Sequence, residues 1–92
     1  MKKDQATALT EKHQALVHSD NKKVMSHVQR ESDEWCLNTL MLEEVNVPFK
    51  YKRKKQYRSL KGQRVNLTYY AAVEIVAGFE IEVMNVVRIK VS

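Results

Sequence analysis

The sequence predicts a single α+β domain over residues 1–92, with N-terminal helices packed on a three-stranded antiparallel sheet. Two observations carry this prediction. Between residues 21 and 44, apolar side chains recur every three or four positions, which is the period of a helix. After Pro48, apolar and polar side chains alternate instead, which is the period of a β-strand.

The helical half is predicted to contain one helix or two, over about residues 5–18 and 21–44. Apolar residues surround the segment 35–42 on nearly all sides, so Trp35 is interpreted as a core anchor and Cys36 as a buried, inert thiol. Ser32 could instead cap a separate helix, which leaves a kink near residue 32 as an alternative. Residues 5–18 contain few apolar anchors, and the sequence leaves open whether residues 1–20 are ordered.

The second half predicts a meander of three strands, at about 49–59, 63–75 and 79–91. Opposed residues of an antiparallel pair share a face, so the apolar odd positions should pair with one another. Three-residue loops at 60–62 and 76–78 satisfy this requirement and place glycine third, where a positive φ is needed. A two-residue turn at 77–78 would pair odd with even positions and is therefore excluded by this reasoning.

The positive charge is concentrated in residues 48–64, which carry eight basic side chains and no acidic one. Residues 1–47 carry six basic and eight acidic side chains, and residues 65–92 carry two and three. In the predicted register, Phe49, Tyr51 and Tyr57 face the core. The basic side chains of the same strand that face outward are Lys50, Lys52, Lys54 and Arg58.

Two functions could explain this outward row. Lysine and arginine neutralise phosphates, and an exposed aromatic ring can stack on a base. Lysine on an edge strand also prevents aggregation between sheet edges, and the sequence favours this second explanation. The candidate residues for binding a nucleic acid or another polyanion are Lys50, Lys52, Lys54, Arg58, Arg64 and Tyr70.

The first functional hypothesis is a small cytoplasmic accessory or regulatory protein that binds another protein or assembles with itself. A homodimer is expected because the apolar strand 79–91 carries no edge protection. The alternative is a nucleic-acid-binding module that uses the basic strand. The pattern predicts no enzyme, cofactor or metal, since His27 and Glu31 alone are too few ligands. The single cysteine indicates a reducing compartment, and no apolar stretch is long enough to cross a membrane.

Overall fold

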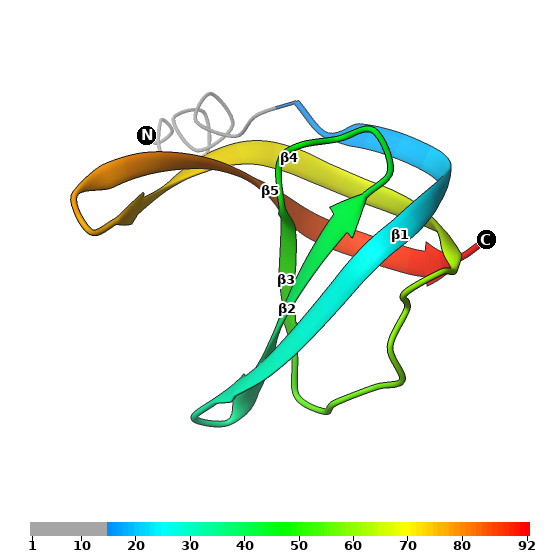
Figure 1. The fold of residues 1–92 in the computed structure, drawn as a ribbon, viewed down its shortest axis with the longest axis horizontal. Helices are drawn as coiled ribbons and strands as arrows, with labels where there is room; N and C mark the ends of the chain where they lie inside the picture. The colour runs from blue at the N-terminus through cyan, green and yellow to red at the C-terminus, as the bar shows by residue number, and fades with distance from the viewer. Residues whose placement is uncertain (1–14) are drawn as a thin grey trace, which may run out of the picture.

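The computed structural model describes residues 15–92, which form five strands and no helix (Figure 1). The predicted α+β class is therefore wrong, and the described residues include no helix that could span a membrane. The greater part of the first predicted helix, residues 5–14, lies outside the described residues. The strands close into a barrel in the order β1-β2-β3-β5-β4. Their bounds are β1 (Val17–Ser32), β2 (Trp35–Leu42), β3 (Phe49–Arg53), β4 (Arg64–Val76) and β5 (Phe79–Val91).

The segment predicted as the main helix is the β1–β2 hairpin. Ser32 pairs with Trp35 across a two-residue turn, in which Asp33 has a positive φ of 55°. Strand β2 alternates, with its even positions buried and its odd positions more exposed. The alternation is hidden in the sequence because Leu37, which faces outward, is apolar, whereas Asn38, which is buried, is polar.

Strand β1 bends so that it serves both sides of the barrel. Its first part pairs with β4 and its second part pairs with β2. The register shifts between Ser19 and Lys22 against β4, and between Val24 and Ser26 against β2. Extra residues of this kind bend a strand and increase its twist, which lets one strand close the barrel. Asn21 lies in the first shift with a φ of 60°, a conformation that asparagine tolerates better than most residues.

The β4–β5 hairpin confirms two of the predicted strands but corrects their register. Its turn has only two residues, Ala77 and Gly78, with φ of 52° and 85°. Positive φ at both positions is typical of a type I′ turn, whose twist matches that of the flanking strands. The excluded turn is therefore the one observed.

A bulge in β5 explains why the parity argument failed. Thr68 pairs with Arg88 and Tyr69 with Val86, so Val87 is an extra residue on β5. Odd positions pair with odd ones on one side of this bulge and with even ones on the other. Near the turn the predicted core face is consequently solvent-exposed: 60% for Val73, 66% for Ile75 and 70% for Phe79.

Strand β3 ends at Arg53, well before the predicted residue 59, and residues 54–63 form a loop. The strand pairs with β2 antiparallel and with β5 in parallel, and it does not pair with β4 as the meander required. Strand β1 occupies the position beside β4 instead. The parallel pairing is short, because only Phe49 with Met84 and Lys50 with Asn85 are partners.

Apolar side chains from all parts of the barrel meet in its core. The ring of Phe49 packs edge-on against that of Tyr69, with centroids 4.8 Å apart. The buried members of this cluster are Val24, Leu40, Leu42, Phe49, Val65 and Leu67. The sequence identified Phe49, Val65 and Leu67 as core-facing, because strand alternation holds there.

Candidate nucleic-acid interface

The outer faces of β1, β2 and β3 and the adjoining part of β4–β5 enclose an open groove with a volume of about 500 Å³. Its side chains share a face because they are cross-strand neighbours. Leu37 pairs with both Arg30 and Lys52, and Asn85 pairs with both Lys50 and Tyr70. The basic groove, as it is termed below, is defined by Arg30, Leu37, Lys50, Lys52, Tyr70 and Asn85.

Positive charge predominates in the basic groove. Three cationic side chains line it, Arg30, Lys50 and Lys52, against the single carboxylate of Glu74. Lys50 Nζ lies 2.9 Å from Glu74 Oε1, and both side chains are more than one-third exposed. An ion pair this exposed contributes little free energy, so an incoming phosphate can compete for Lys50.

Trp35 stands at the start of β2, beside the basic groove. The Nζ atom of Lys52 lies 5.0 Å from the ring centroid and that of Lys54 lies 4.4 Å from it. The side chain is 36% exposed, so its interpretation as a core anchor was wrong. The odd positions of β2 face outward, and this parity carries the indole to the surface with Leu37.

Three of the six predicted binding residues, Lys50, Lys52 and Tyr70, meet in the basic groove. Lys54 adjoins it through the Trp35 ring. The other two lie elsewhere: Arg58 lines a separate cavity, and Arg64 donates a hydrogen bond to the Asn21 carbonyl oxygen on β1, at 3.0 Å.

Sequence reasoning missed two members of this face, Arg30 and Trp35, because both lay in the predicted helix. The signal that could have revealed them is the alternation of residues 35–42, in which every second residue is apolar and suited to burial.

The edge-strand explanation of the lysines loses much of its basis. Strand β3 is paired along its whole length by β2, and by β5 at Phe49 and Lys50. Only residues 51–53 lack a partner on the β5 side. Lys50 therefore does not lie on a free edge, and protection from edge-to-edge pairing does not account for it.

Within residues 15–92, no three His, Cys, Asp or Glu side chains are grouped closely enough to hold a metal ion. Comparisons with protein-family models, with curated proteins and with solved structures gave no match to this chain. Proposals about its function therefore rest on the chemistry of its own surface.

Proposed function

We propose that this protein binds single-stranded nucleic acid along the basic groove, as a binding module without catalytic activity. The observation that carries the proposal is the exposed Trp35 ring beside Lys52 and Lys54, next to a groove with three cationic side chains. Aromatic rings within a basic groove are the combination with which proteins hold single strands irrespective of sequence.

The arrangement suits a strand whose bases are free to stack. A base placed on Trp35 would displace Lys52 and Lys54 from the ring, and their flexible side chains could then reach the flanking phosphates. Tyr70 provides a second aromatic ring at the other side of the basic groove. The bases of a duplex are already stacked and paired, so they cannot use these rings.

The topology of the barrel supports the same proposal by analogy. A long first strand shared by two neighbours, a parallel β3–β5 pair and the order β1-β2-β3-β5-β4 are also features of the OB-fold. Proteins with that fold bind oligonucleotides or oligosaccharides on the face of the second and third strands. Here that face carries the basic groove. Folds host many functions, so the argument depends on the side chains.

Trp35 is the only tryptophan in the chain, so its fluorescence reports directly on the proposed site. Titration with a 12-nucleotide single strand should quench this fluorescence and saturate. Each phosphate contact should lower the logarithm of the association constant by ~0.7 per logarithmic unit of salt. A matched 12-base-pair duplex should bind more weakly. Absence of binding to single strands of both DNA and RNA at low salt would contradict the proposal.

Charge reversal distinguishes the basic groove from a general attraction to a basic protein. Lys52→Glu with Lys54→Glu should abolish binding of the 12-mer. Lys22→Glu with Lys23→Glu makes the same change in net charge on exposed residues of β1 outside the basic groove. This control variant should retain most of the affinity. Equal losses in the two double variants would indicate a non-specific effect of net charge.

A second candidate function, self-assembly, is favoured by the end of the β4–β5 hairpin near its turn. This end extends away from the rest of the barrel in Figure 1 and exposes Val73, Ile75 and Phe79. Within the described residues, the outer edges of 70–76 and 79–83 have no strand partner. Exposed apolar edges of this kind pair readily with another copy. We propose a homodimer through this hairpin, in a cytoplasm that keeps Cys36 reduced.

A further inference from the structure

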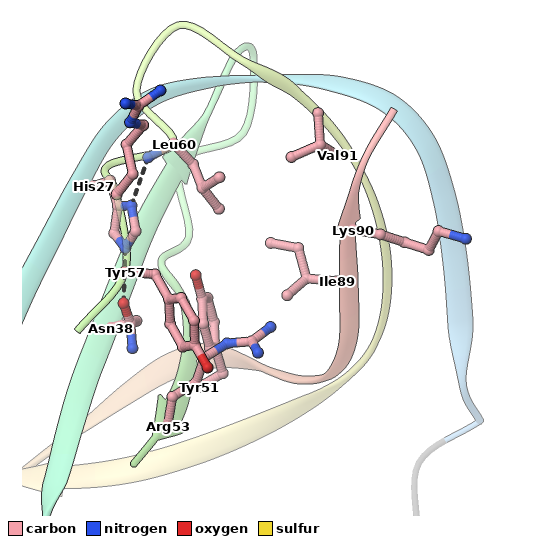
Figure 2. Close-up of a pocket in the computed structure, with 10 residues that line it drawn as sticks. His27, Asn38, Tyr51, Arg53, Tyr57, Leu60, Ile89, Lys90 and Val91 are labelled. Atoms are coloured by element: carbon pink, nitrogen blue, oxygen red, sulfur yellow. Dashed lines mark hydrogen bonds between the residues drawn. The ribbon is translucent and has the colours of Figure 1, made fainter. Parts of the chain in front are cut away.

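A second cavity, separate from the basic groove in its chemistry, lies where β3 and β5 diverge. These strands pair only at Phe49 with Met84 and at Lys50 with Asn85, and the loop 54–63 covers the gap that follows. The cavity has a volume of about 190 Å³. In Figure 2, Leu60 and Ile89 face each other across it and Arg53 reaches into the space between the strands.

Hydrogen bonds hold the walls of this cavity in place. The Leu60 N–H donates to His27 Nδ1 at 2.8 Å. The His27 ring proton of the neutral form is therefore on Nε2, which donates to Asn38 Oδ1 at 2.7 Å (Figure 2). The Gln29 side chain bonds both the carbonyl oxygen and the N–H of Tyr57, at 2.7 and 3.2 Å. The loop is thus fastened to β1 at two positions, and the cavity is formed before any ligand arrives.

The cavity contains positive charge without a matching carboxylate. Arg53 and Arg58 both line it, no acidic side chain does so, and within residues 15–92 neither arginine forms an ion pair. The guanidinium of Arg53 lies 5.5 Å from the centroid of the Tyr51 ring and 5.3 Å from that of Tyr57. These rings restrict the orientation of the guanidinium, whose planar fork of donors matches a phosphate. Lys90 points away from the cavity in Figure 2 and is not part of this group.

The size of the cavity limits the ligand. Sites for drug-sized molecules usually enclose about 300–1,000 Å³, so about 190 Å³ is too small for a whole nucleotide. It is several times larger than the space that one water molecule needs. A single tetrahedral oxyanion fits these limits and the donor geometry.

We propose that this cavity binds one phosphate group, held by Arg53 and Arg58. The phosphate has two possible sources, free inorganic phosphate or the terminal phosphate of a nucleic acid strand. The proposal does not depend on the proposed function, because inorganic phosphate tests it without any oligonucleotide.

The test begins with the unaltered protein. Its amide and arginine side-chain NMR signals are followed while chloride is exchanged for inorganic phosphate at constant ionic strength. We expect saturable shifts confined to Arg53, Arg58, Leu60 and His27. No saturable shift at these positions, or shifts spread evenly over the basic surface, would overturn the proposal for free phosphate.

Variants then assign the contact. Arg53→Gln with Arg58→Gln should weaken phosphate binding by about 10- to 150-fold, the range expected when hydrogen bonds to a charged group are lost. Arg30→Gln with Arg88→Gln removes the same charge outside the cavity and should leave phosphate binding unchanged. A folded Arg53/Arg58 variant that binds phosphate normally would overturn the assignment. If that variant does not fold, the location of the shifts in the unaltered protein decides.

The final comparison separates the two sources. A 12-nucleotide strand with a 5′-phosphate is compared with the same strand without it. Tighter binding of the phosphorylated strand, lost in Arg53→Gln with Arg58→Gln, would identify the terminal phosphate as ligand. Equal binding of the two strands, together with saturable inorganic phosphate binding, would identify free phosphate. Failure of both phosphate tests would refute the site, whether or not the strand binds to the basic groove.

Discussion

Replacing Trp35 with alanine should weaken binding of a single-stranded 12-mer by about 5- to 140-fold. The range follows from the loss of one stacked base, which is worth ~1–3 kcal/mol. The side chain is available for stacking because it is 36% exposed and is covered only by the flexible Lys52 and Lys54.

The same substitution should leave the barrel folded. It removes two exposed cation–π contacts worth ~0.5–1 kcal/mol each, against ~5–14 kcal/mol of stability expected for a domain of 92 residues. Circular dichroism during urea unfolding would measure this loss.

Fluorescence anisotropy of a labelled 12-mer provides the binding assay, because it does not depend on the tryptophan that has been removed. Trp35→Phe is the matched control, since it keeps an aromatic ring and should retain most of the affinity. Binding of the alanine variant within twofold of the unaltered protein would refute the stacking role. Equal losses in the alanine and phenylalanine variants would also contradict it, because they would not depend on the ring.

Three further predictions concern stability and assembly. Phe49→Ala should lower the free energy of unfolding by ~3–5 kcal/mol, whereas Phe79→Ala, at an exposed position, should change it by less than ~1 kcal/mol; chemical denaturation would test the contrast. Burial raises the pKa of Tyr51 above its ordinary value of 10.0, so the folded state keeps a proton that the unfolded chain loses. Stability from this group is therefore complete below pH ~10 and falls as the pH rises through the raised pKa, and Tyr51→Phe should flatten this part of the stability–pH curve. Ile75→Lys with Phe79→Lys should convert the proposed dimer to a 10.8 kDa monomer in light scattering, whereas a monomeric unaltered protein at high concentration would contradict the dimer.

The parts of the fold that could be predicted are those in which one face of a strand is apolar and the other polar. Residues 63–67 and 79–91 alternate clearly, and strands are present there. Outward placement of Lys50 and Lys52 followed from the same alternation. Local patterns of this kind survive in the structure because each depends on a single sheet face.

The errors arose where a distant partner decides the structure. Strand β1 is mostly polar and contributes only Val24 to the buried core, so its own sequence gives little indication of a strand. Strand β2 is apolar on both faces, because its outer face lines the basic groove. The extra residue at Val87 reverses the parity of the hairpin, and nothing in its immediate sequence marks it. Closure of the barrel brings these segments together, and single-sequence periodicity does not contain that information.

The division of β1 between two neighbours has a consequence for the order in which the chain can assemble. Ser32 meets Trp35 only three residues later, so this end of the strand can pair as soon as the hairpin leaves the ribosome. Val17 pairs with Tyr69, so the other end must wait until most of the chain has been synthesised. Such distant pairings slow folding, because the intervening chain must be ordered before the contact is made. The first strand to be synthesised is therefore among the last to be completely paired.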